Sequence, residues 1–211
     1  MKCFKWLALL FVTGSTACFS PIYDTAMTHE GFTVGGGVAY QKVIETQWLG
    51  GTPRIAFIRP EINVNYGFTN WFSVVGRAGC FMPIDTVGYL IPCAGLGIKL
   101  STPGARILNL ALRVEADYPN TFALTPMIGI ATNKGHEFLT AGVQVTGCIA
   151  LGTLGFFVNM HPFKGAHILV GSDFSPFYLG DLGLAPGFYA GIGYTHNFGK
   201  KRSEEVKDTL D

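Results

Sequence analysis

Apolar and polar residues alternate with a period of two through most of this chain, in segments of about a dozen residues separated by short turn signals. Such alternation places successive side chains on opposite faces of a β-strand. Most intervening segments are short and contain Gly, Pro or Asn, which predicts antiparallel neighbours. We predict ten strands, at residues 31–47, 54–68, 71–82, 88–100, 106–118, 121–132, 137–149, 153–161, 166–174 and 187–198. Eight strands is the alternative count, because the pattern is weakest in the eighth and ninth segments.

The segment 106–118 shows the two faces most clearly. Its apolar face carries Leu108, Leu110, Leu112, Val114, Ala116 and Tyr118, and its other face carries Asn109, Ala111, Arg113, Glu115 and Asp117. Segments 54–68, 71–82, 88–100 and 137–149 sort in the same way. The second face is a mixture of small, polar and isolated charged residues rather than a continuous charged surface.

Composition decides which face points inward. A soluble barrel has an apolar interior, whereas a transmembrane barrel has an apolar exterior. Only 14% of the 211 residues are charged, too few to cover ten outward strand faces in water. We therefore predict an all-β, antiparallel, up-and-down transmembrane β-barrel. The net charge of +1, with scattered Lys and Arg, argues against a nucleic-acid partner.

The first seventeen residues have the pattern of a secretory signal peptide. Lys2 and Lys5 form the basic region, residues 6–12 the apolar region, and residues 14–17 the small-residue cleavage site. Cys18 follows directly, which leaves two alternatives: lipidation of this cysteine, or ordinary cleavage after Ala17. We expect residues 18–30 to form an N-terminal periplasmic segment, residues 31–199 the barrel, and residues 200–211 a charged periplasmic tail.

The last predicted strand, Phe188 to Phe198, resembles the closing strand of small Gram-negative outer-membrane β-barrel proteins of the porin-like kind. In that family the insertion signal contains a glycine and ends in a phenylalanine, and Gly193 and Phe198 stand at those positions. The hairpin at residues 66–74 is similar to the tyrosine, glycine and turn pattern of such barrels. The resemblance implies a location in the bacterial outer membrane, with membrane lipid and the outer-membrane insertion machinery as partners.

The polar faces of consecutive strands contribute a set of charges that we expect inside the barrel. They are Arg59, Glu61, Arg77, Lys99, Arg113, Glu115 and Asp117. In a narrow barrel these charges either pair and fill the lumen or line a water-filled path. The first alternative predicts a structural or surface-interaction barrel without transport, and the second predicts a narrow porin-like channel for passive diffusion of small solutes.

The sequence contains none of the short motifs that we searched for as marks of a hydrolase, a zinc protease or a P-loop. No Cys or His spacing suggests a metal site, and no cofactor is expected. We therefore predict no enzymatic activity, and an outer-membrane hydrolase is kept as a remote alternative. Cys80 and Cys93 are expected as apolar fillers or, if directly opposite in a hairpin, as a disulfide.

Overall fold

The computed structural model describes residues 21–43, 56–84, 90–103, 107–118, 122–132, 135–148, 151–175 and 185–198. The strands are β1 (Gly31–Val43), β2 (Ala56–Gly67), β3 (Phe72–Pro83), β4 (Ile91–Ser101), β5 (Leu108–Tyr118), β6 (Phe122–Ala131), β7 (Glu137–Cys148), β8 (Leu151–Met160), β9 (Ala166–Ser175) and β10 (Ala185–Asn197). Within the described ranges, no helix is long and apolar enough to cross a membrane.

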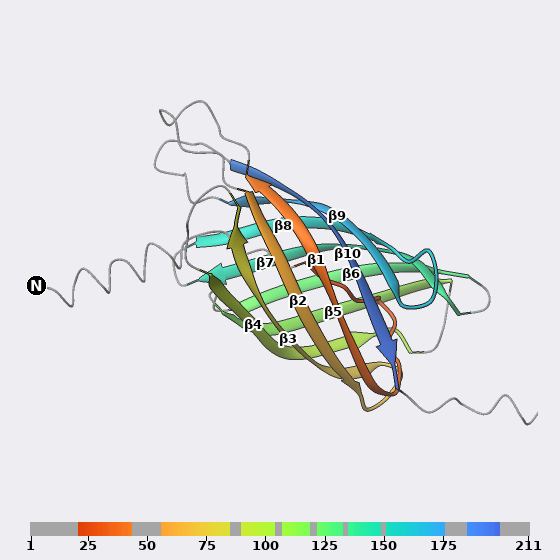
Figure 1. Cartoon of the computed structure of the whole chain (residues 1–211). Coiled ribbons are helices and arrows are strands. Elements are labelled where there is room, and N and C mark those ends of the chain that lie inside the picture. The colour runs from red at the N-terminus through yellow and green to blue at the C-terminus, as the bar shows by residue number, and fades with distance from the viewer. Residues whose placement is uncertain are drawn as a thin grey trace, which may run out of the picture.

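These strands form one closed barrel in which each strand pairs with its sequence neighbours, and β1 pairs with β10 to close the ring (Figure 1). All ten pairings are antiparallel. The predicted all-β, up-and-down architecture and the count of ten strands are confirmed, and the alternative of eight is wrong. The closing pair runs without interruption from Thr33 opposite Asn197 to Val43 opposite Gly187.

Large apolar side chains cover the outside of the barrel, and polar side chains occupy the inside. In β5, Leu108 and Leu110 are 51% and 50% exposed, whereas Arg113 and Glu115 are 1% and 2% exposed. The burial pattern alternates strictly along the whole strand. This is the reverse of a soluble barrel and is the polarity of a barrel whose outer surface contacts lipid.

The two ends of the barrel differ in their connections. At one end, which we call the turn end, β2 leads to β3, β4 to β5, β6 to β7 and β8 to β9. Gly31 at the start of β1 and Phe198 after β10 lie at this end too, and the Phe198 N–H donates to the Phe32 carbonyl. The opposite end, the loop end, has the connections at 44–55 and 176–184, which lie outside the described residues.

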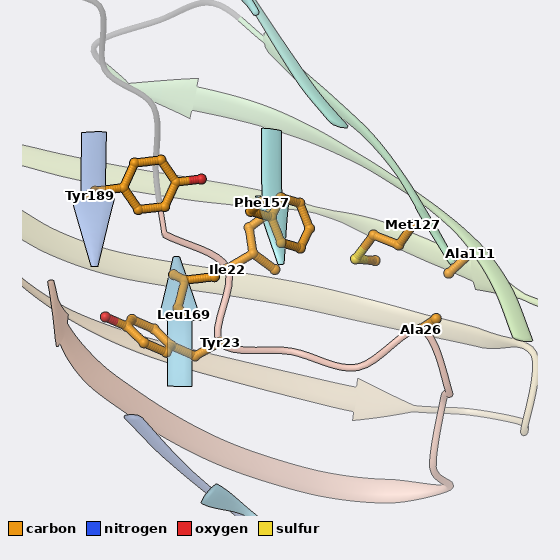
Figure 2. Close-up of a cluster of buried hydrophobic side chains, with 8 residues drawn as sticks. All are labelled: Ile22, Tyr23, Ala26, Ala111, Met127, Phe157, Leu169 and Tyr189. Atoms are coloured by element: carbon orange, nitrogen blue, oxygen red, sulfur yellow. The ribbon is translucent and has the colours of Figure 1, made fainter. Parts of the chain in front are cut away.

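The segment of residues 21–30, which we call the plug, lies inside the barrel over residues 21–28, and the exposed residues 29 and 30 join it to β1. Figure 2 shows Ile22, Tyr23 and Ala26 on a chain that runs between the strands. All three side chains are at most 1% exposed. We expected this part of the chain in the periplasm. The difference has a physical reason, since the segment carries both apolar side chains and a carboxylate that match the lumen wall.

Cys80 and Cys93 are both free. In the register of β3 and β4, Cys80 is opposite Pro92 and Cys93 is opposite Gly79, so the two cysteines are offset by one position. An offset of one residue places two side chains on opposite faces of a sheet. Cys93 is buried on the lumen side and Cys80 is on the outer face, which rules out the disulfide alternative.

Candidate functional site

The candidate site is the lumen at the level of the plug. The apolar side of the plug packs against the wall formed by β8, β9 and β10. Ile22 and Tyr23 belong to one buried cluster with Phe157, Leu169 and Tyr189 (Figure 2). Leu169 is fully buried and points inward, on the opposite face of β9 from its two lipid-facing neighbours. The polar lumen therefore contains one apolar patch, and the apolar side chains of the plug pack against it.

Three glycines give the Tyr23 ring room against the barrel wall. A Cβ atom at Gly191 would lie 2.5 Å from the Tyr23 hydroxyl oxygen, and one at Gly193 would lie 2.5 Å from its Cδ1 atom. A Cβ at Gly37, in the facing strand β1, would also collide with the ring. Any larger residue at these positions would occupy the space of the ring. Gly193, which we predicted as part of an insertion signal, thus also has a packing role.

The charged side of the plug is held by β4 and β5. The Nζ atom of Lys99 lies 3.0 and 2.9 Å from the two carboxylate oxygens of Asp24, and 3.2 Å from the carbonyl oxygens of both Thr25 and Met27. Arg113 Nη1 lies 3.6 Å from the same carboxylate. Burial raises the pKa of Asp24, but Lys99 and Arg113 outweigh this effect and hold the pKa below its ordinary value.

Wall side chains also bind the backbone of the plug. The Glu137 carboxylate accepts the N–H groups of Ala26 and Met27 at 2.7 and 3.1 Å. Asn159 Nδ2 donates to the carbonyls of Ile22 and Asp24 at 3.2 and 3.3 Å. The Tyr23 carbonyl accepts from Asn63 Nδ2 at 2.7 Å and from Thr195 Oγ1 at 3.4 Å, and the Thr28 and Ser101 hydroxyl oxygens are 2.7 Å apart. Side chains of six different strands therefore hold the plug.

Arg77 is the centre of a network of buried charges on β2, β3 and β5. Its guanidinium lies 3.9 Å from the Glu61 carboxylate on β2, 3.2 Å from Glu115 and 2.6 Å from Asp117 on β5. Glu115 also accepts from Arg113 at 2.7 Å, which connects this network to the plug. Buried charges are tolerated when they are paired in this way.

A second polar chain crosses the seam where the barrel closes. Arg59 on β2 donates to the Gln41 side chain on β1 at 2.9 Å, and Gln41 donates to Asp173 on β9 at 3.1 Å. The Arg59 guanidinium also lies 3.8 Å from the centre of the Phe81 ring, a cation–π contact. This chain occupies the lumen nearer the loop end.

All seven charged residues predicted for the lumen are buried, and the structure brings six of them into one connected set with Asp24, whereas Arg59 belongs to the second chain. Three further lumen carboxylates escaped the sequence reasoning: Asp24, Glu137 and Asp173. Phe198 is exposed on the outer face and stacks near Phe32 and His196. The expected signal peptide, Cys18 and the expected charged tail lie outside the described residues.

Thr140, His161 and Glu137 form a hydrogen-bonded set in the lumen. The Thr140 hydroxyl donates to Glu137 in a short contact. His161 Nε2 lies 2.8 Å from the same hydroxyl oxygen, and because the hydroxyl proton faces Glu137, this ring nitrogen is the donor. The Glu137 carboxylate is also bound by the N–H groups of the plug, so it has a structural role in this set. Among the described residues, no group of His, Cys, Asp or Glu could hold a metal ion.

A closed antiparallel barrel with a charge-paired polar interior and an apolar exterior defines the class of transmembrane β-barrels. No protein-family model and no curated protein matches this sequence.

Several solved structures are similar in fold, and they are outer-membrane β-barrel proteins. Neisserial surface protein A is 10% identical, with 80% of this chain and 98% of that chain covered and a TM-score of 0.38. The KdgM porin in complex with disordered oligogalacturonate is 13% identical, with 77% and 98% covered and a TM-score of 0.40. The attachment invasion locus protein Ail of Yersinia pestis is 14% identical, with 80% and 100% covered and a TM-score of 0.33. Values this low concern the barrel architecture alone.

Proposed function

We propose that this protein is an integral β-barrel of a bacterial outer membrane whose lumen is closed at rest by its own N-terminal plug. Its role is then structural or in surface interaction, without open diffusion through the lumen. The observation that carries this proposal is the contact of Lys99 with the plug, since the partners described for its ammonium group all come from residues 24–27. In an open, water-filled lumen this ammonium group would be hydrated instead of being enclosed by the plug.

The pairing of the other lumen charges argues against a selective channel as well. A narrow porin-like channel for small solutes would use Arg77 to attract or select ions. Instead, Arg77 contacts Glu61, Glu115 and Asp117, three carboxylates on two strands. Charges that neutralise each other along one part of the wall, from β2 to β5, are more typical of a structural network than of an ion-selective lining.

Planar-bilayer conductance of the mature, refolded chain tests the closed lumen. We expect no discrete channel steps at neutral pH, with a general porin as the positive control for the bilayer. Steady channel activity of the unmodified chain would overturn the closed-barrel proposal and favour a porin-like channel.

The membrane location is supported by the apolar outer surface and by the expected signal peptide at residues 1–17. We predict that Leu112→Arg, on the outer face of β5, lowers the free energy of unfolding in lipid bilayers by about 2–4 kcal/mol, because a lipid-facing charge near the midplane is costly. Leu112→Ala is the matched control for loss of packing. Urea unfolding in lipid vesicles measures both. Equal stability of the two variants would argue that β5 does not face lipid.

The end of β10 supports a role in insertion. Phe198 is 63% exposed at the turn end, and its ring lies beside those of Phe32 and His196 on the outer surface. We predict that Phe198→Ala reduces the amount of heat-modifiable protein in outer-membrane fractions of cells while it leaves the stability of refolded protein nearly unchanged. Phe163→Ala, another exposed phenylalanine at the turn end, is the control. An equal loss of heat-modifiable protein for both variants would contradict a specific role of Phe198 in insertion.

A further inference from the structure

The plug is attached to the barrel in a way that differs from every strand. Among the described residues, no backbone-to-backbone hydrogen bond joins residues 21–29 to the wall. The contacts given above are made instead by wall side chains, from Lys99, Glu137, Asn159, Asn63, Thr195 and Ser101. Each such contact can be exchanged for water without breaking the strand ladder. The plug can therefore leave while the barrel stays folded.

The chain has a pivot at the point where the plug joins β1. Gly31 has a φ of 96°, a conformation that only glycine adopts readily, and there the chain reverses from β1 back into the lumen. The carbonyl of His29 lies over Gly67 at the end of β2, where any Cβ atom would collide with it. Both glycines are at the turn end and are opposite each other in the β1–β2 register. A rotation at Gly31 would carry the plug out through this end.

The space that the plug leaves would have more polar than apolar groups on its wall. Phe157, Leu169 and Tyr189 form one apolar patch, but Asn63, Glu137 and Asn159 would lose their bonds to the plug backbone. Lys99 and Arg113 would also lose the Asp24 carboxylate. Water binds readily to such a polar surface, whereas an apolar lumen would stay dry. Withdrawal would thus produce a hydrated passage at this level of the barrel.

We propose that residues 21–30 are the gate of a latent channel, and that withdrawal of the plug about Gly31 allows small ions to cross the barrel. This goes beyond the closed barrel proposed above, which requires only that the plug is docked at rest. Asp24 stabilises the docked plug, because its carboxylate pairs with both Lys99 and Arg113. The apolar contacts of Ile22 and Tyr23 keep the closed state favoured.

Two variants test the gate. The first deletes residues 21–28, and the second combines Asp24→Lys, which repels Lys99 and Arg113, with Thr28→Cys and Ser101→Cys. The two hydroxyl oxygens are 2.7 Å apart, so the introduced cysteines can lock the plug by a disulfide. All native cysteines are replaced by alanine in the locked chain. A matched chain keeps Asp24 and carries only the two introduced cysteines.

Planar-bilayer recordings of the refolded variants supply the result. We expect the deletion variant to show discrete conductance steps where the unmodified chain is silent. The locked Asp24→Lys chain should be silent when oxidised and should conduct after reduction, while the matched chain with Asp24 stays mostly closed in both states. If the deletion variant fails to fold, the locked pair decides alone.

The proposal is overturned if the folded deletion variant is silent. It is also overturned if the reduced Asp24→Lys chain is silent while the thiol introduced by Thr28→Cys reacts with a water-soluble maleimide, since the plug is then out and no channel exists. Conductance of the unmodified chain at rest would instead contradict the closed-barrel proposal, so the two failures are distinguishable.

Discussion

Replacement of Arg77 by methionine is expected to lower the free energy of unfolding of the refolded barrel by about 3–5 kcal/mol. The arginine is the shared partner of Glu61, Glu115 and Asp117, all of them buried in the lumen. Methionine fills a similar volume but leaves these carboxylates with much less positive charge nearby. The large cost comes from the uncompensated carboxylates and not from lost packing.

Urea unfolding in detergent or lipid, followed by tryptophan fluorescence and by heat-modifiable gel mobility, measures this effect. The triple variant Arg77→Met, Glu115→Gln, Asp117→Asn is the informative control, because it removes two of the stranded charges together with their partner. We expect it to recover a large part of the lost stability. If Arg77→Met alone is as stable as the unmodified chain, the charges in the lumen are hydrated and the lumen is open.

Gly193→Val is expected to affect both the stability of the barrel and the docking of the plug. Its Cβ atom would lie 2.5 Å from the Tyr23 ring and 2.8 Å from the Gly36 carbonyl oxygen. Overpacking of this kind typically costs about 1–3 kcal/mol. We expect the variant to refold with lower stability and with the plug displaced, and Tyr23→Ala in the same chain to recover part of the loss. The Gly36 contact would remain, which is why recovery should be partial.

The same variant separates two roles for Gly193. If the glycine serves only recognition by the insertion machinery, Gly193→Val should impair assembly in cells and leave the refolded protein as stable as before. Ile192→Val, one position away on the outer face, is the control for a change in β10 that does not touch the plug. Unfolding of both refolded variants, measured beside their levels in outer-membrane fractions, distinguishes these outcomes.

The barrel could be predicted from the sequence because lipid outside and polar groups inside impose opposite requirements on alternate residues. Where the requirement is strict, as from Leu108 to Tyr118, the alternation fixed both the strand and its orientation. It was less clear in β9, where Ile168, Leu169 and Val170 form an apolar run. Leu169 shares the lumen face with His167 and Asp173, but nothing local to β9 reveals that this face meets the plug.

The plug could not be predicted from periodicity, because residues 21–30 form neither a strand nor a helix. One indirect signal existed. The predicted lumen set had four basic and three acidic residues, and buried charges need partners. The surplus of one positive charge indicates that at least one carboxylate was missing from the set, and of the three that the structure adds, Asp24 is the one bound to Lys99. Finding it required the closed barrel, since these residues are 75 positions apart.

The buried position of Pro21 sets a limit on what can happen to the cysteine three residues before it. Three residues span at most about 11 Å. Because Pro21 is buried when the plug is docked, an acyl group on Cys18 would be tied within that distance of the docked plug. We therefore expect lipidation to compete with docking. If a fraction of the chains incorporates palmitate and Cys18→Ala abolishes that label, we expect the labelled chains to have withdrawn plugs. Processing at residue 18 would then determine covalently whether the barrel is closed or open.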